Sequence, residues 1–152
     1  MQDCGIIRTY YDNGNIEEEY FQMNGLKHGL FTLYEHYGDI KIRTIEYVEG
    51  KKHGTYKEYH RRSNDVFYIC QYNDNIKVGQ AIFYHENGGI DNICSYENGK
   101  ISGMRYWYYE NGNLLQSCNY VDGMRQGECT IYKPDGTIKY ISLYVDNEVI
   151  YE

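Results

Sequence analysis

A glycine followed five residues later by a tyrosine recurs six times along the chain, and this spacing constrains the fold more than any other feature. Successive copies are 24 or 25 residues apart and begin at Gly5, Gly29, Gly54, Gly79, Gly103 and Gly127. Self-similarity at this period is typical of repeats that stack along one axis, each contacting only its neighbours. We therefore predict a single repeat array over residues 1–152, with units of about 5–28, 29–53, 54–78, 79–102, 103–126 and 127–150.

Two turn signals divide each unit into two strands. After the motif tyrosine comes a turn such as Asn111-Gly112, and Asn-Gly between β-rich flanks is the strongest short-range hairpin signal. A second turn, such as Asn24-Gly25, ends each unit. In two units asparagine replaces the glycine of this second turn, and asparagine is the next best residue for a left-handed conformation. These replacements are Asn75 and Asn147.

The predicted fold class is all-β: an elongated, twisted, single-layer antiparallel meander of six β-hairpins. β-branched and aromatic residues fill the segments between the turns, and glycine at fixed places in every period disfavours helix. The third unit departs from the pattern, because its first turn, residues 61–65 (RRSND), has no glycine. We expect a longer and looser hairpin there.

The motif tyrosines are predicted to form a structural ladder. Cross-strand aromatic pairs stabilise sheets, and a tyrosine ring can bury area while its hydroxyl still reaches water. This role is favoured over a catalytic or ligand-binding one. The ladder consists of Tyr10, Tyr34, Tyr59, Tyr84, Tyr108 and Tyr132. A second tyrosine column ends the second strand of most units, at Tyr47, Tyr72, Tyr96, Tyr120 and Tyr144.

The other face of the first strand in each unit carries the candidate binding residues. Side chains two and four positions after each repeat glycine are mainly apolar, and a single-layer sheet has no second layer to cover them. They can pack against long side chains of neighbouring strands, or they can form a groove that receives a partner. Trp, Tyr and Arg are the residues most enriched at interface hot spots. The candidate partner-binding residues are Phe31, Tyr56, Phe83, Arg105 and Trp107.

The charge of the chain disfavours polyanionic partners. The net charge is -7, and the longest run of like charge is Glu17 to Glu19. Nucleic acids and anionic membranes both require a basic patch, and the sequence shows no basic stripe. No nucleic-acid binding is therefore expected, membrane lipid is disfavoured, and the acidic surface favours a basic protein partner.

Neither a membrane span nor a signal peptide is evident in the sequence. No apolar run approaches the roughly 18 residues that a membrane helix needs. The first ten residues, MQDCGIIRTY, lack the basic start and the hydrophobic stretch of a signal peptide. We expect a cytoplasmic protein, bacterial or, for a viral source, in the cytoplasm of the host.

Three of the five cysteines, Cys70, Cys94 and Cys118, fall at the repeat period. Equivalent residues two strands apart would be about 9 to 10 Å from each other, given a strand spacing of about 4.8 Å. A disulfide requires Cα atoms within about 7 Å. We therefore expect these cysteines to be reduced, buried, small apolar residues. No C-x-x-C pair supports a zinc site.

Catalytic and metal-binding patterns are absent from the sequence. His28 and His53 precede repeat glycines, but the later units lack them, so no metal site is expected. The position after the ladder tyrosine holds His60, His85 or Tyr109 and is interpreted as permissive. No glycine-rich loop opens a helix that could hold phosphate. We predict a protein that is not an enzyme, with no catalytic residues and no cofactors.

Residues 103–115, GMRYWYYENGNLL, and residues 120–127, YVDGMRQG, resemble MORN repeats, and the resemblance extends over residues 5 to about 150. More narrowly, the repeats are similar to the variant MORN repeats of bacterial YwqK-like proteins, which are antitoxins of toxin–antitoxin systems. Similar arrays occur in large DNA viruses.

The resemblance implies a non-enzymatic protein-interaction scaffold, and in its narrowest form an antitoxin-like neutraliser of a partner protein. MORN arrays have also been linked to phospholipid binding and to dimerisation. Two alternatives therefore stay open: a phospholipid or membrane-surface association module, and a self-assembling structural protein that pairs its edge hairpins with another copy.

Overall fold

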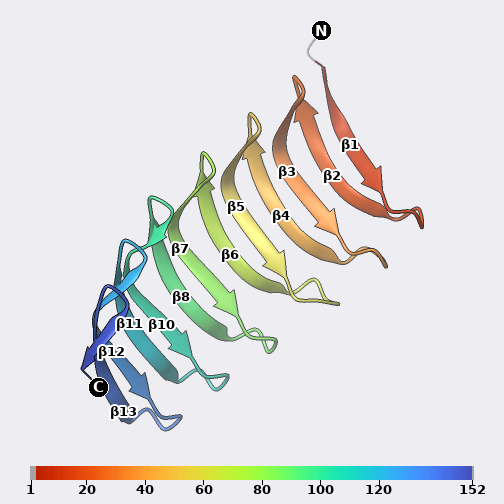
Figure 1. Cartoon of the computed structure of the whole chain (residues 1–152). Coiled ribbons are helices and arrows are strands. Elements are labelled where there is room, and N and C mark those ends of the chain that lie inside the picture. The colour runs from red at the N-terminus through yellow and green to blue at the C-terminus, as the bar shows by residue number, and fades with distance from the viewer. Residues whose placement is uncertain (1–2, 152) are drawn as a thin grey trace. The chain divides into compact units, whose positions relative to one another are not determined.

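The computed structural model describes residues 3–151, which form fourteen β-strands and no helix (Figure 1). The chain divides into two compact units: unit 1 ends at Ile76 and unit 2 begins at Lys77. Within each unit, strands adjacent in the chain pair in an antiparallel manner, which confirms the predicted all-β meander of hairpins. The part of the chain described contains no helix long and apolar enough to cross a membrane.

Unit 1 contains three successive hairpins. Its strands pair in chain order, and each hairpin begins with a strand that ends at a ladder tyrosine. The strands are β1 (Cys4–Tyr10), β2 (Ile16–Met23), β3 (Leu26–Tyr34), β4 (Lys41–Val48), β5 (Lys51–Tyr59) and β6 (Val66–Asn73).

The strands of unit 2 follow the same plan from β7, which starts at the boundary between the units. They are β7 (Ile76–Tyr84), β8 (Ile90–Glu97), β9 (Lys100–Ile101), β10 (Gly103–Tyr108), β11 (Leu114–Val121), β12 (Met124–Tyr132), β13 (Ile138–Val145) and β14 (Glu148–Tyr151). Two details differ from the prediction of two strands per repeat. Ser102 separates β9 from β10, and β14 pairs with β13 beyond the last predicted hairpin.

The turns have the backbone conformation that their residues predict. Asn75 and Asn147, which replace glycine, have φ angles of 71° and 73°, so the expected left-handed conformation is confirmed. In the third hairpin, Arg62 has a φ of 67° and takes the left-handed position that glycine occupies elsewhere. The His60 amide donates to the Asp65 carbonyl at 2.9 Å and closes this longer turn.

The repeat glycines lie inside strands and not in turns. From the second repeat onward they have positive φ, for example 65° at Gly79 and 84° at Gly54. Strand pairing shifts beside them: Ile45 faces Tyr56, and two residues later Tyr47 faces Lys52. Four residues on one strand therefore oppose two on the other. The glycine is conserved in position along the array because this bulge needs a residue that adopts positive φ without strain.

One central row of side chains on a single face forms the core of each unit. In unit 1, Phe31 faces Ile45 and Ile45 faces Tyr56, and the exposed fractions of Phe31 and Tyr56 are 5% and 6%. In unit 2 the corresponding row contains small residues, which include Ala81, Cys94, Cys118, Cys129 and Ser142. The opposite face buries small polar side chains at Thr32, Thr44, Ser117 and Thr130.

The prediction that Cys118 is reduced is wrong, because Cys118 forms a disulfide with Cys129. The prediction compared equivalent cysteines two strands apart, whereas Cys118 on β11 and Cys129 on β12 face each other directly. Their Cα atoms are 4.2 Å apart, within the reach of a disulfide. The predicted burial of Cys70, Cys94 and Cys118 is confirmed.

Candidate partner-binding face

The five candidate binding residues lie on the same face of the sheet in their respective units. We call this the aromatic face; it carries the side chains two and four positions after each repeat glycine. In unit 1 it holds Phe31 and Tyr56, which share the central row. In unit 2 it holds Phe83, Arg105 and Trp107, where Phe83 and Trp107 both face Asn92. The structure therefore places the candidates in two groups.

In unit 1, the candidate side chains are packed among other aromatic rings. The Phe31 ring lies 6.1 Å from each of the rings of Tyr20 and Tyr47. The Tyr56 ring lies 6.0 Å from that of Tyr68. Because Phe31 and Tyr56 are almost fully buried, they contribute mainly to the stability of unit 1.

The aromatic face of unit 1 carries carboxylates beside its cations. The Tyr56 hydroxyl donates to the Glu58 carboxylate, and Glu58 faces Arg43 on the neighbouring strand. Burial, followed by the hydrogen bond to Glu58, raises the pKa of Tyr56 well above its usual range. Lys27 Nζ lies 3.9 Å from the centre of the Phe31 ring and 3.6 Å from Glu18 Oε2. Two carboxylates, Glu18 and Glu58, therefore occupy this face.

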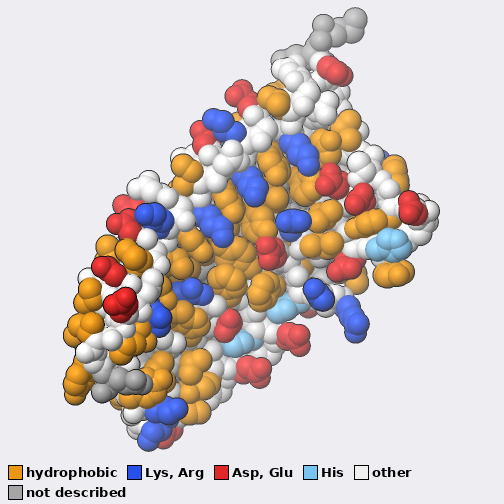
Figure 2. All heavy atoms as spheres, viewed as in Figure 1, with side chains coloured by type: hydrophobic (Ala, Val, Ile, Leu, Met, Phe, Trp, Pro, Cys, Tyr) orange, Lys and Arg blue, Asp and Glu red, His pale blue; other side chains and the backbone are white. Residues whose placement is uncertain are grey.

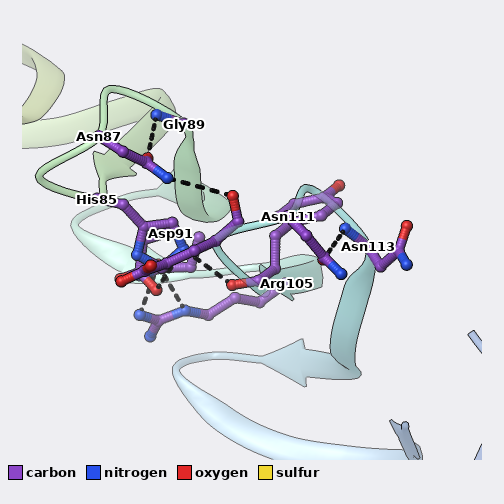
Figure 3. Close-up of polar contacts among 10 residues, drawn as sticks. His85, Asn87, Gly89, Asp91, Arg105, Asn111 and Asn113 are labelled. Carbon is purple, nitrogen blue, oxygen red and sulfur yellow. Dashed lines mark hydrogen bonds and ion pairs between the residues drawn. The ribbon is translucent and has the colours of Figure 1, made fainter. Parts of the chain in front are cut away.

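In unit 2, the three candidate residues form one cluster around Arg105. The Arg105 guanidinium lies 4.5 Å from the centre of the Trp107 ring and 5.9 Å from that of Phe83. Its Nη2 and Nε donate to Asn92 Oδ1 at 2.8 and 3.2 Å. Figure 3 shows the Arg105 side chain, with these contacts as dashed lines. Because Asn92 is neutral, it holds the Arg105 guanidinium in place without neutralising its positive charge. All three candidate side chains are half-buried.

Sequence reasoning missed a column of cations on the aromatic faces. Basic residues two positions before a repeat glycine lie over rings of the second tyrosine column. Their charged groups are 5.9, 5.2, 5.0 and 4.1 Å from the ring centres in the pairs Lys27/Tyr47, Lys52/Tyr72, Lys77/Tyr96 and Arg125/Tyr144. Figure 2 shows Lys and Arg side chains among hydrophobic ones. The basic residues lie at a constant offset of two positions from the repeat glycine, and this regularity could have identified the column from the sequence.

The ladder tyrosines lie on the opposite face. The hydroxyls of Tyr59 and Thr44 are 3.2 Å apart, and Thr44 points away from the aromatic face. Tyr10, at the first strand, is 57% exposed, whereas the later ladder residues are half-buried. Burial raises the pKa of Tyr34. These tyrosines line the face that is not proposed for binding.

In three repeats the residue after the ladder tyrosine contacts the backbone of the next repeat, which the interpretation of this position as permissive did not foresee. The hydroxyls of Tyr11 and Tyr109 donate to the backbone carbonyls of Tyr34 and Tyr132, at 2.7 and 2.9 Å. His85 Nε2 makes the same contact with the Tyr108 carbonyl at 3.0 Å (Figure 3). Each donor connects one repeat to the ladder position of the next. The other repeats hold Glu35, His60 and Lys133 at this position, and the buried Nε2 of His60 has no hydrogen-bond partner among the described residues.

The described residues include no group of three or more His, Cys, Asp or Glu side chains placed to hold a metal ion. His53 is an exposed residue near the start of β5, with Nδ1 3.6 Å from Asp74. His85 Nε2 is 3.8 Å from Asp91, beside the carbonyl contact (Figure 3). These histidines belong to local contacts at the hairpin ends.

Successive hairpins with a common bulge glycine, a tyrosine ladder and one aromatic face define a β-hairpin repeat protein. The profile of the MORN repeat variant matches residues 3–24, 77–98, 101–122 and 125–146, more than half of the chain. The chain therefore belongs to the MORN repeat variant family. Such repeats are non-catalytic and generally serve as protein or membrane interaction modules. No curated protein matches the chain.

The profile does not match residues 25–76, although the structure contains the same hairpins there. This stretch includes the turn without glycine at residues 61–65 and, on the aromatic face, the carboxylate of Glu58. Three of the four matched segments lie in unit 2. The repeats that follow the family pattern most closely are therefore those that carry the Arg105 cluster.

Proposed function

We propose that this chain is a protein-binding module and that the aromatic face of unit 2 receives the partner. The observation that carries the proposal is the cluster of Arg105 between Trp107 and Phe83. Arginine and tryptophan dominate interface hot spots, where they combine a large apolar area with directional polar groups. Here the asparagine contact already fixes the arginine, so a partner would pay little entropy to order it.

Exposed acidic residues at both ends of the hairpins favour a protein over a membrane surface. Glu86, Glu110 and Asp135 are exposed at one end, and Asp122 and Asp146 are exposed at the other. A planar anionic bilayer would approach these acidic turns together with the face between them and would be repelled by them. A protein segment can lie along the middle of the face and avoid the turns.

The experiment is affinity capture from extracts of the native source with three forms of the chain. Trp107→Ala should lose the partner, because truncating a hot-spot aromatic costs about 2 kcal/mol or more, roughly thirtyfold in affinity. Tyr106→Ala is the matched control, because Tyr106 precedes Trp107 on the same strand and lies on the opposite face. Retention of the partner by Trp107→Ala, or equal loss in both variants, would contradict the proposal.

Two narrower roles can be tested with the same material. Neutralisation of a toxic partner, as by an antitoxin, predicts that expression of the captured protein arrests growth and that co-expression of this chain restores it. Self-assembly predicts a mass above that of the 18.0 kDa monomer in light scattering. The edge strand β14 is exposed along its length and is the place where a second copy would pair.

A further inference from the structure

We infer that the aromatic face of unit 2 binds an acidic peptide segment of its partner; this rests on the proposed function and names the chemical class of the ligand. Strand alternation places Lys77, Arg105 and Arg125 on this face, and it places no Asp or Glu there. The face is thus cationic within an acidic chain. Net charge favoured a basic partner, whereas the local charge of the binding face favours the opposite.

The two arginines keep their charge available for a ligand. Arg105 donates to the neutral Asn92, and Arg125 lies 4.1 Å from the centre of the Tyr144 ring. Across residues 3–151, neither arginine has a carboxylate within ion-pair distance. Asp91 reaches the site only through Asn92, whose amide donates to it at 3.0 Å.

The aromatic face of unit 1 carries two carboxylates and that of unit 2 carries none, which favours unit 2 as the site. Lys27 pairs with Glu18, and Glu58 faces Arg43 and accepts from Tyr56. An acidic ligand at unit 1 would be repelled by Glu18 and Glu58. At unit 2 it would place carboxylates beside Arg105 and Arg125, which lie over aromatic rings and are partly desolvated, so that a new ion pair is worth more than at an open surface.

The spacing of Lys77 and Arg125 matches that between the first and seventh residues of an extended peptide. Lys77 and Arg125 occupy the same position in repeats two apart, with Ile101 at the position between them. Equivalent positions in successive hairpins are two strands apart, about 9.6 Å. A polyproline II helix rises about 3.1 Å per residue and has three residues per turn, about 9.3 Å.

A polyproline II segment crossing the strands would therefore present its first and seventh residues to Lys77 and Arg125. Its fourth residue would lie near Ile101 and could reach Arg105. Aromatic-lined surfaces are the usual receptors of polyproline II segments, because the flat rings pack on proline and the ligand loses little entropy. The half-buried rings of Tyr96 and Tyr120 supply such a surface.

The test uses Trp107, the only tryptophan of the chain, as a fluorescence reporter. A peptide of three Glu-Pro-Pro triplets should give a saturable change in Trp107 emission, and added salt should weaken the binding. Peptides of the same length with Lys or Gln in place of Glu should bind at least about tenfold more weakly. Equal binding of the three peptides, or no binding of the acidic one, would overturn the inference.

Variants of the full chain then locate the site. Arg105→Gln and Arg125→Gln should each weaken binding of the acidic peptide on the order of tenfold. Lys133→Gln makes the same charge change in an exposed hairpin turn of unit 2 and should leave binding unchanged. Equal loss in all three variants would reduce the effect to net charge and refute the site. Because the peptide comparison uses the unaltered chain, a variant that fails to fold does not decide the outcome.

Two other kinds of anionic ligand are compared with the acidic peptide. Tighter binding of phosphatidylserine vesicles, or of a short oligothymidylate, than of the acidic peptide would replace the inference with a lipid or nucleic-acid site. Loss of the captured partner in Trp107→Ala without peptide binding would refute only the acidic class of ligand. Binding of the acidic peptide with capture that does not depend on Trp107 would instead support this inference and contradict the proposed function.

Discussion

Replacing Tyr56 with phenylalanine tests how the aromatic face of unit 1 is stabilised. The Tyr56 side chain is 6% exposed, and its hydroxyl donates to the Glu58 carboxylate. Tyr56→Phe keeps the ring and its contacts with the rings of Tyr68 and Tyr72, and removes only this hydroxyl. The change therefore isolates one buried, charge-assisted hydrogen bond.

The expected loss in the free energy of unfolding is about 2 kcal/mol at pH 7. A hydrogen bond to a charged group contributes about 1.5–3 kcal/mol, and its loss leaves a partly buried carboxylate with one partner fewer. Arg43 faces Glu58 and compensates part of the change, which places the expectation in the lower half of that range. Urea denaturation followed by fluorescence measures the difference.

The pH dependence supplies an independent readout. Burial and Glu58 raise the pKa of Tyr56, so the folded state favours the protonated phenol. This contribution to stability is fully present below the unfolded pKa of about 10 and is lost as the pH rises toward the higher pKa of the folded state. Wild type should therefore lose stability more steeply than Tyr56→Phe as the pH rises above about 10.

The matched control is Tyr120→Phe, since the Tyr120 hydroxyl makes no hydrogen bond with the residues described. It should change the free energy of unfolding by less than about 0.5 kcal/mol. If Tyr56→Phe were as stable as wild type at pH 7, or kept the wild-type slope at alkaline pH, the assignment of Tyr56 as a donor to Glu58 would be wrong.

Three further changes test other parts of the structure. Tyr109→Phe removes the hydroxyl that donates to the Tyr132 carbonyl and should cost about 0.5–1.5 kcal/mol in urea denaturation; no loss would remove this bond from the account of repeat stacking. Reduction of the Cys118–Cys129 disulfide, which closes a short loop with a sequence separation of 11, should cost about 2–3 kcal/mol, and Cys118→Ser should make the melting temperature insensitive to reductant. Tyr108→Ala removes a half-buried ladder ring and should cost about 2 kcal/mol, and a loss well below 1 kcal/mol would contradict the ladder as a source of stability.

The hairpins were predictable because their signals are local. Asn75 and Asn147 were identified as left-handed turn residues from their place in the period, and their φ angles agree. Strand alternation was local as well, so Phe83, Arg105 and Trp107 were placed on one face before their contacts were known. A regular period supplies such information several times over, once for each unit.

Contacts between neighbouring strands were not predictable in the same way, because they depend on register. The bulge at each repeat glycine offsets one strand against the next, so Cys118 faces Cys129 and not a residue at the repeat period. The contact between Lys77 and Tyr96 also links two neighbouring strands, so it depends on register as well. Burial also escaped prediction: Phe31 and Arg105 occupy equivalent rows, but the aromatic neighbours of Phe31 cover it.

The hydrogen bonds from Tyr11, His85 and Tyr109 end on main-chain oxygens of the following repeat, which every amino acid supplies. A newly duplicated repeat would thus find its acceptor without any compensating substitution next door. Gene duplication could lengthen or shorten such an array in whole-repeat steps, while side chains on the aromatic face diverged to suit different ligands. The number of repeats and the ligand preference would then evolve independently of each other.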